Sequence, residues 1–145
     1  MEEANLQRLI DDGVPEGRGT EYKVDLAIAT DQEKKEFLAD VSSFANTVGG
    51  VLYIGIKEEN LLPVELTGMA ITDQDIEIQR IESLMRNGIE PRLQGVNILP
   101  VRLSSSRLVI VLEIPQSWAL PHRVSLKKDT TSSMHATLVV SIPWT

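Results

Sequence analysis

Cysteine is absent from the 145 residues of this chain, and only two histidines, His122 and His135, are present. These absences exclude a disulfide scaffold, a thiolate metal site, a cysteine nucleophile and a histidine-rich metal centre. Aromatic residues make up only 4%, so we expect a core of mainly leucine, isoleucine and valine. No apolar run approaches the roughly 18 residues that a membrane helix needs, and the first residues, M-E-E-A, are acidic, unlike a signal peptide. We therefore expect a cytoplasmic protein without a membrane partner.

Positive charge is also scarce, because 14 lysines and arginines face 21 aspartates and glutamates, for a net charge of -7. Binding to phosphates needs a clustered positive field, so this balance argues against a simple nucleic-acid coat protein. A local basic patch and a nuclease built on carboxylates both remain open. The length and the 42% hydrophobic content are those of one folded domain.

Helical periodicity predicts three helices, at residues 2–12, 30–46 and 72–88. The second opens with a capping box, in which Thr30 and Glu33 each bond to the backbone of the other. We expect the pair Gly49-Gly50 to end this helix, and Gly88 to end the third in the left-handed conformation.

Runs of apolar and β-branched residues predict four strands, at 20–26, 51–56, 96–103 and 108–114. The second run is continuously apolar, which is typical of a central strand buried on both faces. A charged turn is expected at 57–60, and a hairpin turn at 104–107. The order of elements predicts an α/β (α+β) domain with a single mixed β-sheet packed against about three helices.

The most informative segment is residues 42–56, S-S-F-A-N-T-V-G-G-V-L-Y-I-G-I, preceded by E-Y-K at 21–23 and followed by I-P-Q-S at 114–117 and P-H at 121–122. This ordered set resembles the Schlafen AlbA-type domain family, a divergent AlbA family described as DNA-binding. The resemblance spans residues 16 to about 123. The matching residues are Glu16, Glu21, Lys23, Phe37, Asp40, Val41, Phe44, Ala45, Asn46, Gly49, Gly50, Ile54, Gly55, Ser117, Pro121 and His122.

The resemblance implies a nucleic-acid-binding function, for DNA or RNA. Domains of this family commonly stand at the N-terminus of longer bacterial proteins, often ahead of an ATPase-like region. We therefore expect an N-terminal module of a larger transcription regulator or ATPase-linked protein. The family also forms the core of Schlafen proteins, some of which cleave tRNA or rRNA, so a metal-dependent RNA endonuclease is the alternative.

The nuclease carboxylates implied by the resemblance fall on Glu16, Glu21 and Lys57. The third position is a lysine, which would repel Mg²⁺ or Mn²⁺, and Glu58 could replace it only if the turn shifts by one residue. In a nuclease, Glu16 and Glu21 would hold the metal and Lys23 would contact the scissile phosphate. The competing interpretation, which the pattern favours, is that Glu21 and Lys23 alternate outward on a solvated strand face. Catalysis is therefore not predicted.

Six residues are candidates for contact with nucleic acid. Arg102 and Arg107 flank the expected hairpin turn and form the best candidate for a nucleic-acid arm, with ordinary surface charge as the alternative. Asn46, beside two glycines, could approach a phosphate, although a role in ending the helix is the simpler interpretation. Trp118 is expected to anchor its loop to the core. The full set is Lys23, Asn46, Arg102, Arg107, His122 and Arg123.

We expect the domain to cover residues 1–129, because residues 130–145 depart from the segment that the family resemblance leads us to expect. A one-base shift of codons for Y-A-R-N-S-G-S-K-Y-P-M-D, a family-like segment, is compatible with residues 134–145. The tail is therefore interpreted as out-of-frame translation, with a lost C-terminal region. A native edge strand at 138–142 is the alternative.

A third functional hypothesis is a homo-oligomerisation or protein-interaction module, which the net charge of -7 favours. Eukaryotic Schlafen cores carry two such lobes in one chain. A single lobe is therefore expected to pair with itself as a homodimer, the commonest symmetric assembly.

Overall fold

The computed structural model describes residues 1–119 and 121–126, so the predicted tail at 130–145 and His135 lie outside the described residues. The three helices are α1 (Glu3–Asp11), α2 (Asp31–Asn46) and α3 (Gln74–Gly88). The strands are β1 (Thr20–Lys23), β2 (Gly50–Ile54), β3 (Lys57–Glu59), β4 (Leu62–Glu65), β5 (Ile89–Glu90), β6 (Asn97–Arg102), β7 (Leu108–Ile114) and β8 (Arg123–Val124).

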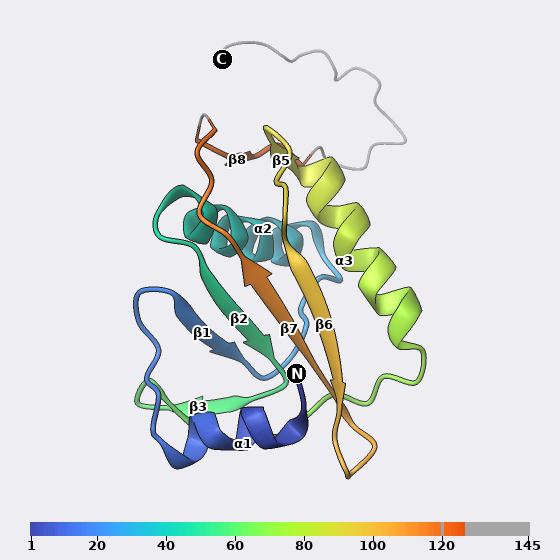
Figure 1. Cartoon of the computed structure of the whole chain (residues 1–145). Helices are drawn as coiled ribbons and strands as arrows, with labels where there is room; N and C mark the ends of the chain where they lie inside the picture. The colour runs from blue at the N-terminus through green and yellow to red at the C-terminus, as the bar shows by residue number, and fades with distance from the viewer. Residues whose placement is uncertain (120, 127–145) are drawn as a thin grey trace.

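One mixed sheet forms the centre of the molecule, with strand order β1-β2-β7-β6 (Figure 1). β1 pairs with β2 in parallel, whereas β7 pairs antiparallel with both β2 and β6. The predicted fold class, an α+β domain with a mixed sheet and three helices, is confirmed. β3–β4 and β5–β8 form two further small sheets.

Both faces of the central sheet are packed. α2 and α3 cover one face, where Leu38, Val41 and Ile81 meet the β2 and β7 residues Leu52 and Ile110. α1 packs through Leu6 on the opposite face, which carries two tyrosines and the valines of β6 and β7. β7 contributes buried side chains to both layers, as expected for a central strand.

The start of α2 follows the sequence prediction, and the end of α3 does not. The Thr30 side chain accepts from the backbone N–H of Glu33, and the Glu33 carboxylate accepts from the backbone N–H of Thr30. Gly88 was expected in the left-handed conformation, but it is the last residue of α3 and its φ is not positive. A Cβ at Gly88 would collide with Leu38. Close packing of α3 on α2 therefore explains this glycine.

Residues 57–60, predicted as a turn, mostly form a strand instead. β3 pairs antiparallel with β4, and Asn60 and Leu61 make the connection with positive φ angles. The Glu58 carboxylate accepts from the Leu61 backbone N–H at 3.1 Å, which stabilises this tight connection. Among residues 1–119 and 121–126, no helix has the length and apolar character needed to cross a membrane.

Candidate functional site

The alternation of β1 determines which side chains reach the candidate site. Tyr22 is buried, stacks on Tyr53 with 5.4 Å between ring centroids, and donates its hydroxyl hydrogen to the Val14 carbonyl at 2.7 Å. Because neighbouring residues of a strand point to opposite faces, Glu21 and Lys23 both point toward the side of α2. Burial, then the neighbouring Tyr53 and Glu16, raises the pKa of Tyr22 to about 12.

Lys23 lies between two carboxylates. Its Nζ is 3.0 Å from Glu21 Oε2 and 2.9 Å from Asp40 Oδ2, the latter on α2. Burial lowers the pKa of Lys23, but the hydrogen bonds to Asp40 and Glu21, together with their negative charges, raise it by more. Its pKa therefore lies above the ordinary value of 10.5.

This ion-paired group borders a cleft of about 380 Å³ between β1, α2 and the β3–β4 connection. Glu16, Glu21 and Asp40 all line it, so the structure brings together two of the predicted carboxylates with a third from α2. Glu16 is itself engaged, because its Oε2 accepts from the backbone N–H of Tyr22 at 2.9 Å. The remaining lining residues are Gly17, Thr20, Ser43, Phe44 and Leu61.

The fit of this cleft to a divalent metal is poor. Lys57, at the third carboxylate position, pairs with Glu59 at 3.6 Å, and Glu58 is held by the β3–β4 connection. Within the described part of the chain, no group of three or more histidine, aspartate and glutamate side chains is placed to hold a metal ion. The ammonium of Lys23 is already ion-paired with Glu21 and Asp40, two of the carboxylates that a metal would need.

The ion-paired group predicts a dependence of stability on pH. Because the pKa of Lys23 is raised by folding, its contribution is complete below pH 10.5 and is lost as the pH rises through the raised value. We expect Lys23→Gln to lower the free energy of unfolding at pH 8, with the difference from the native chain shrinking above pH 10.5. Urea unfolding measures this, with the exposed Lys57→Gln as the matched control. A difference that stays constant up to pH 12 would contradict the assignment.

The two hairpin arginines are engaged with backbone carbonyls. Arg102 donates to the carbonyls of Ile71 at 2.7 Å and Ser106 at 3.0 Å. Arg107 donates to the carbonyls of Thr67 and Gly68 at 2.8 and 3.1 Å. Both guanidinium groups therefore brace the β6–β7 hairpin and the segment that leads into α3.

Asn46 and His122 form one network instead of two separate contacts. The Asn46 amide donates to the His122 carbonyl at 2.9 Å, and its oxygen accepts from the His122 backbone N–H at 2.8 Å. The buried His122 ring bonds to the carbonyl of Pro91 at 2.5 Å through Nδ1 and to Ser117 Oγ at 2.6 Å through Nε2. Arg123 pairs with Glu90 at 2.9 Å on the surface. Asn46, Pro91, Ser117 and His122 are called the His122 network below.

Trp118 contradicts its prediction as a core anchor, because 87% of its surface is exposed. The His122 network, and not the indole, fixes this loop to the rest of the fold. In the sequence, this loop is marked only by the spacing of Ser117, Pro121 and His122 in the family-like pattern. That spacing does not predict whether the Trp118 side chain is buried or exposed.

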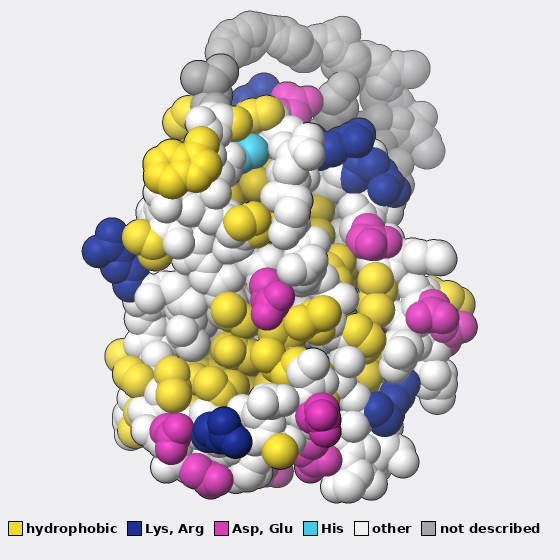
Figure 2. Space-filling model, in the orientation of Figure 1, with side chains coloured by type: hydrophobic (Ala, Val, Ile, Leu, Met, Phe, Trp, Pro, Cys, Tyr) yellow, Lys and Arg dark blue, Asp and Glu magenta, His cyan; other side chains and the backbone are white. Residues whose placement is uncertain are grey.

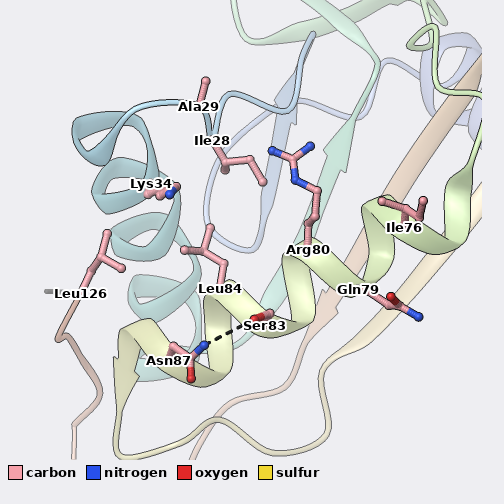
Figure 3. A pocket seen from close by; sticks show the side chains of 10 residues that line it. All are labelled: Ile28, Ala29, Lys34, Ile76, Gln79, Arg80, Ser83, Leu84, Asn87 and Leu126. Carbon is pink, nitrogen blue, oxygen red and sulfur yellow. Dashed lines mark hydrogen bonds between the residues drawn. The ribbon is translucent and has the colours of Figure 1, made fainter. Parts of the chain in front are cut away.

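A second cavity, of about 750 Å³, lies between the start of α2 and the outer face of α3 (Figure 3). Lys34 approaches it from α2 and Arg80 from α3, over an apolar floor that includes Leu84. Arg80 is paired with Glu77 at 2.9 Å. None of the site residues predicted from the sequence lines this cavity.

Comparison with known proteins identifies the family. A search of curated proteins gives no match. Among solved structures, the N-terminal domain of an ATP-dependent DNA helicase RecG-related protein from Nitrosomonas europaea is similar, with 16% identity and a TM-score of 0.54 over 90% of this chain and 94% of that domain. The DIP2311 protein from Corynebacterium diphtheriae has 16% identity and a TM-score of 0.48, over 82% of this chain and only 22% of that protein.

The model of the Schlafen, AlbA_2 family matches residues 16–136 of the chain. This match covers most of the sequence, and it includes Glu16, the β1–α2–β2 unit around Lys23 and the His122 network. The chain belongs to the Schlafen AlbA_2 family.

Proposed function

We propose that this chain is a nucleic-acid-binding module that binds its target without cleaving it. The observation that supports binding without cleavage is the ion pair of Lys23 with Glu21 and Asp40, at 3.0 and 2.9 Å. A two-metal or one-metal nuclease needs carboxylates that are free to coordinate a cation. Here the cation is a lysine, and the remaining glutamate of the cleft, Glu16, accepts a backbone hydrogen bond.

Family membership and the similar fold of a RecG-related N-terminal domain support binding to nucleic acid. They also support placing the chain as the N-terminal module of a larger ATPase-linked or transcription-regulating protein. The negative net charge and the intramolecular engagement of Arg102, Arg107 and Arg123 favour binding through a small local surface. We expect weak affinity that falls with salt, because each phosphate contact releases counterions.

The experiment combines binding and cleavage in one sample. Single-stranded RNA, tRNA and duplex DNA are incubated with the chain in the presence of Mn²⁺, and the products are separated on a denaturing gel. We expect salt-dependent binding with intact products. Absence of binding to all three at about 10⁻⁴ M, the weak end of non-specific affinity, would overturn the proposal.

A metal-dependent RNA endonuclease is the second candidate, because three carboxylates line the same cleft. For this function Lys23 would have to leave Glu21 and Asp40 when a metal enters. Glu21→Gln tests the candidate in the same gel, with Glu59→Gln, an exposed carboxylate outside the cleft, as the control. Mn²⁺-dependent products that disappear only in Glu21→Gln would replace the binding-only proposal.

We also propose that two copies associate as a homodimer. The observation in favour is a group of exposed apolar side chains on the β3–β4 hairpin, Leu61, Leu62 and Val64. Exposed apolar groups on one small element are common in contacts between chains. Sedimentation equilibrium at micromolar concentration measures the association, and a mass equal to one chain would contradict it.

A further inference from the structure

Trp118 is unusual among the aromatic residues that the structure describes. It is 87% exposed, whereas Tyr22, Phe37 and Tyr53 are buried. An indole is the largest apolar side chain, and exposing it to water is unfavourable unless something binds there. The hydrophobic side chains beside the histidine at this end of the molecule are visible in Figure 2.

Described residues on either side of Trp118 are hydrogen-bonded to the rest of the fold. Immediately before Trp118, Ser117 donates its backbone N–H to the Ala45 carbonyl at 2.9 Å, and its hydroxyl bonds to His122 at 2.6 Å. Four residues after Trp118, the backbone of His122 is held by Asn46. Ser117 and His122 are therefore held by the fold, and holding residues near a binding side chain reduces the entropy lost when a ligand binds.

Close backbone packing brings a cation to the same end of the sheet. A Cβ on Gly49 would lie 2.7 Å from the Gln116 nitrogen, and a Cβ on Gly50 would lie 2.8 Å from the Gly19 oxygen. The chain before β1 and the loop after β7 thus both touch this pair of glycines. Arg18 directly precedes Gly19, and Trp118 is two residues after Gln116.

Arg18 is exposed, and it makes no ion pair or side-chain hydrogen bond among the described residues. This distinguishes it from Lys23, Arg102 and Arg107, which are engaged within the fold. Gly17, the residue before Arg18, lines the 380 Å³ cleft. A ligand held by Arg18 would therefore lie at the entrance to the ion-paired cleft.

We propose that Trp118 stacks on an unpaired nucleobase of single-stranded nucleic acid and that Arg18 binds a neighbouring phosphate. This inference rests on the proposed function and names its target class. A flat aromatic ring and a nearby cation are the two components by which proteins hold single strands. In a duplex the bases are already stacked on one another, so an indole on the surface has access to them only in unpaired segments.

A protein partner fits these observations less well. Tryptophans that dominate protein interfaces lie within a ring of side chains that excludes water. Trp118 is 87% exposed, so the described residues do not enclose its indole in such a ring. A nucleobase needs only the flat face of the indole to stack on, and its phosphate needs only the charge of Arg18.

The test uses the intrinsic fluorescence of Trp118. The second tryptophan, Trp144, lies outside the described residues and is replaced in a full-length Trp144→Phe chain, so that Trp118 is the only tryptophan and can be excited selectively over the two tyrosines. In separate titrations, this chain receives single-stranded RNA, a strand of the same length with abasic sites, or duplex DNA. We expect the emission to be quenched by the intact strand, and not by the abasic strand.

Affinity variants give the second readout. Trp118→Ala is expected to weaken binding of single-stranded RNA about 5- to 150-fold, the range for loss of one base stack, and Trp118→Phe to restore part of it. Arg18→Gln is expected to reduce the salt slope by about 0.7, one phosphate contact on a single strand. Arg8→Gln on α1, at the other end of the sheet, removes the same charge and serves as the control (Figure 1).

The outcomes separate this inference from the proposed function. Binding by the native chain that Trp118→Ala leaves unchanged, or quenching by the abasic strand, overturns the stacking inference and leaves the proposed function intact. No binding by the native chain overturns both. If Trp118→Ala changes only the sedimentation mass, Trp118 belongs to a contact between copies and the inference is wrong. Because Trp118 is exposed, its replacement is not expected to affect folding.

Discussion

Gly49→Ala is expected to lower the free energy of unfolding by roughly 2–5 kcal/mol, a large share of the stability of a domain of this size. Gly49 has φ +77°, a conformation that costs alanine about 1–2 kcal/mol. A Cβ would also lie 2.7 Å from both the Gln116 nitrogen and the Ile114 oxygen. These are backbone atoms of the loop after β7 and of the last residue of β7, so the contact cannot be relieved by a side-chain rotation.

Two other glycines separate these causes in urea unfolding. Gly13 has φ +61° with nothing within 4 Å of its Cβ position, so Gly13→Ala reports the backbone conformation alone. Gly17 has open space and no positive φ, so Gly17→Ala is expected to change the stability little. A loss for Gly49→Ala no larger than for Gly13→Ala would show that the close approach of the loop is wrong.

His122→Ala is expected to lower the free energy of unfolding by about 2–4 kcal/mol. The side chain is 5% exposed, and both ring nitrogens are engaged, with the Pro91 carbonyl and with Ser117 Oγ. Removing the ring leaves a cavity and leaves the Pro91 carbonyl without this partner. Thermal and urea unfolding of the variant measure the loss.

The rest of the network supplies the controls for His122→Ala. Ser117→Ala removes one of the two ring contacts and is expected to cost about 1 kcal/mol. Asn46→Ala removes the two bonds to the backbone of His122 and leaves the ring contacts in place. If His122→Ala unfolds within about 0.5 kcal/mol of the native chain, the ordinary range for surface changes, the network does not fix the loop.

Much of the fold could be predicted because the relevant signals are local. The periodicity of α2 and its capping box, the apolar run of β2 and the β-rich run of β7 depend on residues close in the sequence. The β3–β4 hairpin was missed because its residues are charged or include Pro63, and such composition is typical of turns. Gly88 was misinterpreted because its cause, the contact with Leu38, comes from another helix.

The candidate site was predictable in part for the same reason. That Glu21 and Lys23 share one side of β1 follows from the alternation of a single strand, and the family resemblance singled out Glu16 as well. The expected solvated face is instead the side of α2, where Lys23 pairs with Asp40. The pairing of Lys23 with Asp40 joins β1 to α2, so it depends on the tertiary fold. The position of Trp118 between Pro115 and Pro121 predicts an anchor of the loop on the core, but it is His122 that occupies the buried position in that loop.

The central claim is that the chain binds single-stranded nucleic acid without cleaving it. An anisotropy titration of labelled single-stranded RNA, at two salt concentrations with Mn²⁺, tests it most directly when the recovered strand is then run on a gel. We expect saturable binding that weakens with salt by about 0.7 log units per decade for each phosphate contact, and an intact strand. Shortened RNA, or no binding at about 10⁻⁴ M, would contradict the claim.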